Sequence, residues 1–148
     1  CSPHGVGIAR ALERSFSQPD DAMRAADIAI PASGSPAGLQ HALDVAGFEA
    51  TIVEMSWFGD RPVALPLGGA FHSKRLTLKS SQVGHVAASQ RARWDIRRRM
   101  ALAISLLADS SFDALITGES AFDDLPDVMA RLADAPGDAL CHRIKYPP

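Results

Sequence analysis

The sequence predicts an α/β fold in which parallel strands alternate with helices. Three observations carry this prediction: a short apolar run over residues 27–31, a helical pattern from Pro36 to Val45, and a second apolar run over residues 50–55. A strand, a helix and a strand within about 30 residues form a βαβ unit, whose strands are parallel and whose crossover is right-handed. The near-continuous apolar character of the first run is typical of a strand buried on both faces.

The segments around the first two strands follow ordinary local rules. Apolar residues at helical spacing over residues 6–12 predict a short helix, and residues 21–26 predict a helical turn. Pro36 suits the first turn of a helix because its missing N–H has no partner there. Gly47 comes just after the helical pattern, which predicts a C-terminal cap.

The rest of the chain continues to alternate strands and helices. Alternating polar and apolar residues over 75–83 predict a strand with two distinct faces, which Gly84 ends. The other expected elements are an extended segment or short strand at 63–67, a short helix at 68–73, a long helix at 89–108, a strand at 113–117, a helix capped by Asp123 or Asp124, and a closing strand at 140–146.

Composition places the chain among ordinary globular proteins. Its 148 residues are 47% hydrophobic and 22% charged, and the net charge of −2 gives no global attraction to nucleic acid or to a membrane surface. No apolar run approaches the roughly 20 residues that span a bilayer, and the first residues do not form a signal pattern. Cys1 and Cys141 lie far apart, which indicates two free thiols rather than a zinc cluster. We therefore expect a cytoplasmic protein with no membrane partner.

An ordered series of short motifs carries a resemblance to a known family. In sequence order they are a strand ending in Ala32-Ser33-Gly34, a helix followed by Gly47, a strand at 51–54, a strand running into Ser81-Gln82-Val83-Gly84, a long helix, Leu115-Ile-Thr-Gly-Glu119, Phe122-Asp-Asp-Leu125 and a terminal strand. From about Ala26 onward this series resembles the C-terminal part of the medium-chain dehydrogenases/reductases, the superfamily of zinc alcohol dehydrogenases and quinone reductases.

The resemblance implies two parts. Residues 1–84 would form the later half of a Rossmann-type cofactor domain, and residues 85–148 would be the helix-and-strand segment that returns to the catalytic, GroES-like domain. The family's glycine-rich phosphate loop and its zinc ligands would lie upstream of Cys1, so we expect the back part of a longer enzyme. Gly5-Val-Gly7-Ile-Ala-Arg10 fits a helix start better than a phosphate loop, because Arg10 occupies the third glycine position and no apolar strand precedes it.

The resemblance also implies a reaction. The parent enzyme would be an oxidoreductase that uses NAD or NADP to transfer hydride between the nicotinamide and a small alcohol, aldehyde or ketone. We expect this chain alone to be inactive and to contribute no catalytic residue. Its five histidines are scattered without the spacing of metal ligands, so zinc would be bound only through the absent N-terminal half.

Cofactor contacts are expected where three strands end, because ligands of open α/β sheets bind at the carboxyl ends of the strands. Small residues would let a ribose approach, Ser33 could donate a hydrogen bond, and backbone groups after the third strand could hold a carboxamide. The alternatives are an ordinary turn and a packed loop with a core tryptophan. The candidates are Ala32, Ser33 and Gly34, then Met55, Ser56 and Trp57, then Ser81, Gln82 and Val83.

Three other interpretations stay open. Glu54 ends a strand and could act as an acid or base, although a capped or paired carboxylate is the simpler interpretation. The strand at 76–83 could join two copies in a homo-oligomer, which makes a non-catalytic binding or dimerisation module of Rossmann-like fold the main alternative. The arginines over 91–99 could suggest a nucleic-acid helix. Because no aromatic residues interleave in a reading motif and no basic excess exists, we expect a solvated face and no nucleic-acid partner.

Overall fold

A computed structural model of the chain describes the backbone of residues 3–147 and the side chains of residues 6–147. The contacts divide the chain into two compact units. The central unit is Ser17–Ile96, and the terminal unit combines the segment up to Phe16 with the segment that begins at Arg97.

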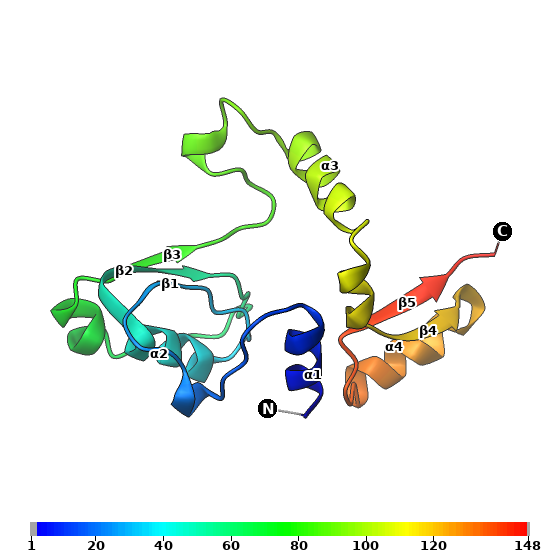
Figure 1. Cartoon of the computed structure of the whole chain (residues 1–148), viewed down its shortest axis with the longest axis horizontal. Coiled ribbons are helices and arrows are strands. Elements are labelled where there is room, and N and C mark those ends of the chain that lie inside the picture. Colours follow the sequence, from blue (N-terminus) through cyan, green and yellow to red (C-terminus); the bar gives the residue numbers. More distant parts are fainter. Residues whose placement is uncertain (1–2, 148) are drawn as a thin grey trace. The chain divides into compact units, whose positions relative to one another are not determined.

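The central unit is built on a sheet of three parallel strands, β1 (Ala26–Ala29), β2 (Ala46–Glu54) and β3 (Thr77–Ser80), in the order β1-β2-β3. Helix α2 (Pro36–Val45) connects β1 to β2 and lies against the sheet (Figure 1). The predicted α/β fold with parallel strands is therefore confirmed. The predicted bounds of α2 coincide with the observed ones, because proline at the first position and the apolar spacing mark both of its ends.

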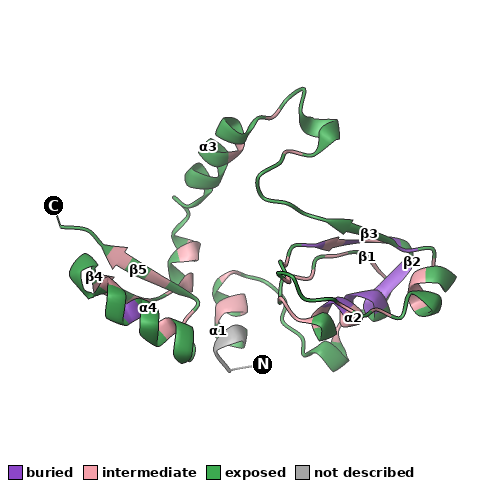
Figure 2. Ribbon diagram, turned by 180° about the vertical axis from the view of Figure 1, so that it is seen from behind, coloured by how far each residue is buried: buried purple, intermediate pink, exposed green. Residues whose placement is uncertain are grey.

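The core of this unit forms between α2 and β2. Leu39, Ala42 and Leu43 follow the i, i+3, i+4 spacing that puts them on one face of α2, and they pack with Ile52 of β2 and with Leu76 just before β3. Figure 2 shows these buried residues gathered on α2 and β2. Leu43 is 1% exposed and Ile52 is 0% exposed, so this contact is the best-buried part of the unit.

Two expectations about these elements are wrong. β1 is not buried on both faces: among the described residues it pairs only with β2, and Ile28 is 63% exposed. Gly47 does not cap α2, because Ala46 already has extended geometry (φ −61°, ψ 140°) and ends the helix. Gly47 lies inside β2, where a Cβ would come within 3.1–3.2 Å of backbone atoms of Ala25. A glycine therefore suits this close backbone approach, because any side chain would be tightly packed against Ala25.

The remaining segments of this unit are short helical turns and loops. A 3₁₀ turn, η1 (Pro19–Asp21), replaces the expected turn at 21–26, and residues 63–66 are irregular. A helical segment, η2 (Leu67–Phe71), is kinked at Gly69, continues over residues 72–73 and so covers the expected short helix at 68–73. The predicted long helix at 89–108 is interrupted: η3 (Ala88–Gln90) ends in turns, and α3 (Ile96–Leu106) begins after them. None of the α3 residues is buried, so little core packing supports a longer helix.

The terminal unit contains a second pair of parallel strands joined by a helix. Its elements are α1 (Pro3–Ala11), the larger part of α3, η4 (Ser110–Leu115), β4 (Ile116–Ala121), η5 (Phe122–Asp124), α4 (Leu125–Asp134) and β5 (Cys141–Lys145). β4 starts later than expected because residues 110–115 form a 3₁₀ helix, which Asp109 caps by accepting from Ser111 N at 2.9 Å. This hydrogen bond lowers the pKa of Asp109. Asp124 precedes α4 as expected, but its side chain makes no capping bond.

A cluster of charged side chains spans β4 and β5. Glu119 pairs with Lys145 and Arg143 on the neighbouring strand. The hydrogen bonds from Lys145 and then from Arg143 lower the pKa of Glu119. No helix in the described part of the chain has the length and apolar character needed to cross a membrane.

The packing of α2 on β2 predicts which substitution in the sheet is costly. Ile52→Val removes a methylene from a fully buried site, so we expect it to lower the free energy of unfolding by about 0.5–1.5 kcal/mol. The matched control is Ile28→Val on β1, where the side chain is 63% exposed and we expect a much smaller change. Urea unfolding followed by circular dichroism measures both, and equal losses would contradict the assigned core.

Candidate functional site

The parallel pairing brings the three predicted groups of residues to one edge of the sheet. Residues 32–34 follow β1, residues 55–57 follow β2, and residues 81–83 follow β3. Backbone hydrogen bonds link the adjacent segments: Met55 N donates to Pro31 O at 3.0 Å, and Ser81 N donates to Glu54 O at 2.9 Å. These segments therefore form one continuous carboxyl edge, the place where open α/β sheets bind ligands. A role for these residues in binding stays a prediction.

The turn after β1 is shaped by glycine and serine. Gly34 has φ +64°, a left-handed conformation that favours glycine, and a Cβ there would meet no atom within 4 Å. Its N–H donates to Ser56 Oγ at 2.9 Å, which ties this turn to the segment after β2. Ser33 Oγ accepts from Ser35 N at 3.3 Å. Because a hydroxyl also carries one donor, the O–H of Ser33 can still bind another group.

The end of β2 carries a buried carboxylate. Glu54 is 9% exposed, and its Oε1 accepts from Ser56 N at 2.6 Å. One oxygen is thus capped, as the simpler interpretation expected. The other oxygen, Oε2, is buried and has no hydrogen-bond partner among the described residues. Hydrogen bonds therefore run from Glu54 through Ser56 to Gly34, and one acceptor at this edge is left unsatisfied.

The side chains of the predicted residues after β2 and β3 are not all arranged as expected. Gln82 Oε1 accepts from Gly84 N at 2.6 Å and lies 3.0 Å from His85 Nδ1, so this side chain folds back on its own turn. Trp57 is 88% exposed, so the alternative of a packed loop with a core tryptophan is wrong. Met55 and Val83 are also largely exposed, which leaves apolar side chains on the rim of the edge.

The edge combines small, polar and apolar groups. An open glycine turn, a serine hydroxyl, exposed apolar side chains and an unsatisfied buried carboxylate are compatible with a ribose and an aromatic ring. The described residues of this edge include no glycine-rich phosphate loop. No group of three or more His, Cys, Asp or Glu side chains in the described part of the chain is arranged to hold a metal ion.

Similar folds occur in solved dehydrogenase structures. L-idonate 5-dehydrogenase from Escherichia coli aligns with a TM-score of 0.71 and 16% identity over 97% of this chain and 40% of the dehydrogenase. 2R,3R-butanediol dehydrogenase from Bacillus subtilis aligns with a TM-score of 0.68 and 17% identity, and the alignment covers 99% of this chain and 42% of that dehydrogenase. A short chain alcohol dehydrogenase from E. coli CFT073, solved with NADH, aligns with a TM-score of 0.67 and 16% identity, and the alignment covers 99% of this chain and 42% of that enzyme.

These alignments establish the class of fold. The chain has the Rossmann-containing α/β fold of part of an alcohol dehydrogenase, as the resemblance predicted, and it spans 40–42% of the length of these three proteins. No protein-family model and no curated protein matches the chain. At 16–17% identity, the likeness is one of fold.

A hollow in the terminal unit was missed by sequence reasoning. It has a volume of about 390 Å³ and is lined by residues of β4 and β5, by Arg131 of α4 and by residues after α4 that include Asp138. Ser120 Oγ lies 2.9 Å from His142 Nε2 within it. A Cβ on Gly118 would come 2.6 Å from His142 Nδ1, and the two residues are register partners on β4 and β5. A glycine in this strand is the sequence feature that could have indicated space for the imidazole. His142 is thus a structurally bonded histidine.

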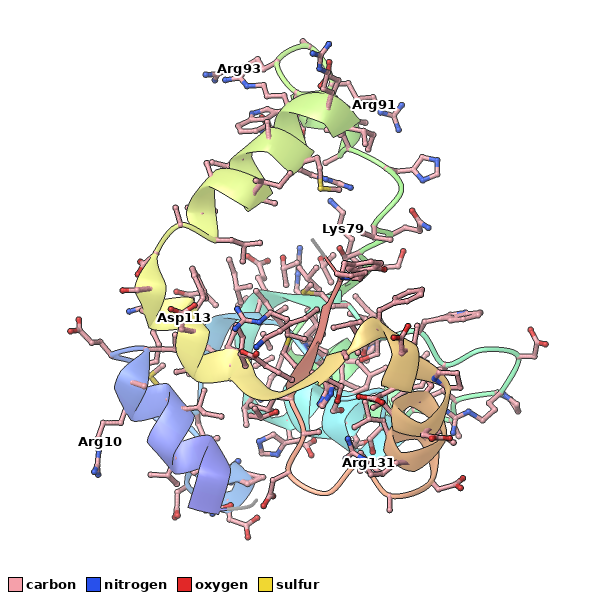
Figure 3. The ribbon with its side chains drawn as sticks, turned by 90° about the vertical axis from the view of Figure 1, so that its right-hand side faces the viewer. Arg10, Lys79, Arg91, Arg93, Asp113 and Arg131 are labelled. Carbon is pink, nitrogen blue, oxygen red and sulfur yellow. The ribbon has the colours of Figure 1, made fainter. Side chains whose placement is uncertain are left out.

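Of the arginines expected on a solvated face, Arg91, Arg93, Arg97 and Arg98 are exposed, whereas Arg99 is half-buried. Figure 3 shows Arg91 and Arg93 extending outward from the segment before α3. Arg91 Nε donates to Val86 O at 3.1 Å, so at least one of these side chains has a local structural role.

The link between Ser56 and Gly34 can be tested by removing one hydroxyl. Ser56→Ala deletes the acceptor of the Gly34 N–H, and we expect a loss of about 0.5–1.5 kcal/mol in local stability, equivalent to roughly 2–10-fold faster amide exchange at Gly34. Ser80→Ala, at an exposed position on β3, is the control. Unchanged exchange at Gly34, measured by NMR, would contradict the assigned link.

Proposed function

We propose that the chain supplies the nicotinamide-ribose side of the cofactor site in an NAD(P)-dependent oxidoreductase. The parent enzyme would transfer hydride between the nicotinamide and a small alcohol, aldehyde or ketone. One observation carries the proposal: the segments after β1, β2 and β3 meet at one carboxyl edge and are joined there by hydrogen bonds through Ser56 and Gly34. The fold shared with dehydrogenases, one of them solved with NADH, supports it.

In this proposal the chain binds and orients the cofactor. When bound, the nicotinamide accepts or supplies the hydride. Ala32 and Gly34 let a ribose approach the backbone, and the Ser33 hydroxyl binds it. Backbone groups of residues 81–83 hold the carboxamide, because the Gln82 side chain is already engaged. The exposed side chains of Met55 and Trp57 would exclude water from one side of the ring.

The proposal assigns the other functions to the rest of a longer enzyme. The proposed division gives residues 1–84 to the cofactor domain and residues 85–148 to the catalytic domain, and its bounds differ from those of the two contact units. The phosphate loop, the choice between NAD and NADP, and zinc, where it is used, depend on residues outside this chain. Its span of 40–42% of the matched dehydrogenases agrees with such a division.

The cofactor proposal predicts selective binding of half a cofactor. We expect nicotinamide mononucleotide to bind with a Kd on the order of millimolar, because only one side of the site is present. NMR shifts should concentrate at residues 32–34, 55–57 and 81–83. Adenosine monophosphate, the half that needs the missing loop, is the control and should bind more weakly.

A second measurement tests the assignment to part of an enzyme. The purified chain should give no turnover of NADH or NADPH with alcohols, aldehydes or ketones. Measurable turnover would overturn the assignment of catalysis to residues outside this chain, and shifts confined to other residues would overturn the cofactor site itself.

A second candidate function is self-association through the strand at 76–83. Its supporting observation is that β3 pairs only with β2 among the described residues, and that all four of its residues are exposed. An exposed strand edge offers unpaired backbone groups to a second strand. We propose that two copies of the chain pair along this edge.

Association through β3 should be sensitive to Leu78. Leu78→Pro removes a backbone N–H from the strand, and Leu78→Lys places a charge there, so both should shift the chain from dimer to monomer in light scattering. Met129→Lys, at an exposed position on α4, is the control. Circular dichroism checks that the variants fold, and a folded proline variant that stays associated would rule out this interface.

A further inference from the structure

Glu54 occupies a distinctive place at the carboxyl edge. It is the last residue of the central strand β2, so it lies between the segments that follow β1 and β3. Its side chain is 9% exposed, and Oε2 is buried without a hydrogen-bond partner among the described residues. A buried polar group without a partner is destabilising, and each such group in a native structure calls for an explanation.

No ion pair in the described part of the chain joins Glu54 to a cation near β2, and this includes Lys79 on β3, whose register partner is Val53, the neighbour of Glu54. Lys74 Nζ donates to Ala46 O at 2.8 Å, at the opposite end of the strand, and Arg75 pairs with Glu49 at 3.1 Å. None of the ion pairs found within the described residues includes Glu54. The negative charge therefore lies at the candidate site without a cationic partner from the described chain.

The carboxylate is closely connected to two of the predicted cofactor contacts. Ser56 N is 2.6 Å from Glu54 Oε1, and Ser56 Oγ accepts from Gly34 N at 2.9 Å. A ligand held against Ser56 and Gly34 would therefore lie one hydrogen-bonded residue away from this carboxylate. Near a protein surface, charges interact several-fold more strongly than in bulk water.

We propose that Glu54 favours binding of the oxidised, positively charged nicotinamide over the reduced, neutral form. This inference rests on the proposed function, because it concerns the same edge of the sheet. The oxidised ring carries a positive charge and the reduced ring carries none, so a nearby carboxylate stabilises only the oxidised form. The same positive charge compensates the buried carboxylate. Glu54 is thus a residue that sets the preference for one redox state of the cofactor.

Substitution by glutamine isolates the charge from the shape. Glu54→Gln keeps an oxygen that can accept from Ser56 N but removes the negative charge. Oxidised and reduced nicotinamide mononucleotide are titrated into the chain, and both Kd values are measured by NMR. We expect the ratio of the oxidised to the reduced Kd to rise about tenfold in the variant. Glu49→Gln, on the same strand but exposed, is the control and should leave the ratio unchanged.

The outcomes separate this inference from the proposed function. If neither form of the mononucleotide shifts residues of the edge, the proposed function is wrong and this inference with it. If both forms bind at the edge and the ratio is the same in the unmodified chain and in Glu54→Gln, the proposed function stands and this inference is wrong.

A measurement on the unmodified chain covers the case in which the variant does not fold. The cation 1-methylnicotinamide and neutral nicotinamide have similar shapes, so their affinities report the charge preference directly. We expect the cation to bind about tenfold more tightly at the edge. Equal affinities there would overturn the inference.

Discussion

Packing of α2 against the central strand β2 is the contact on which the rest of the central unit depends. Leu43 and Ile52 are almost completely buried in it, and the strand that carries Ile52 also pairs with β1 and β3. Because β2 pairs in parallel with both β1 and β3, the strand that this contact anchors lies between the other two and aligns the three carboxyl ends. The candidate site consists of the three segments that leave those ends, so its geometry depends on a helix that contributes only its first residues to the edge.

Local patterns in the sequence predicted those features that local chemistry decides. The bounds of α2, the parallel sheet and the three segments at its edge follow from apolar spacing, a proline and the order of elements. The wrong predictions concern residues whose role or exposure depends on tertiary contacts. Gly47 lies where the backbone of Ala25 comes close and does not end the helix, and Trp57 is exposed rather than packed. The bond between Ser56 and Gly34 joins residues 22 positions apart, so the sequence contains no local signal for it.

The two units differ in what holds them together. The central unit has a contiguous core on α2, β2 and the start of β3, whereas Val128 is the only buried hydrophobic residue recorded in the described part of the terminal unit. There, β4 and β5 are held by backbone pairing and by the ion pairs of Glu119. Exposed ion pairs contribute little to stability, and a two-stranded sheet buries little surface. Local opening should therefore begin in the terminal unit, which leaves the carboxyl edge of the central unit as the better-defined surface.

Opposite electrostatic features meet at that edge. The N-terminus of α2, which follows Ser35, carries the partial positive charge of unpaired backbone N–H groups, and Ser35 makes no side-chain capping bond to satisfy them. Glu54 brings a negative charge to the end of the neighbouring strand, joined to the turn before α2 through Ser56. A ligand with an anionic group and a cationic ring is complementary to such a pair, and a ligand of one sign is not. The oxidised nicotinamide nucleotide has both groups, so under the proposed function the buried carboxylate and the helix end would together favour it over a simple phosphate or a neutral ring.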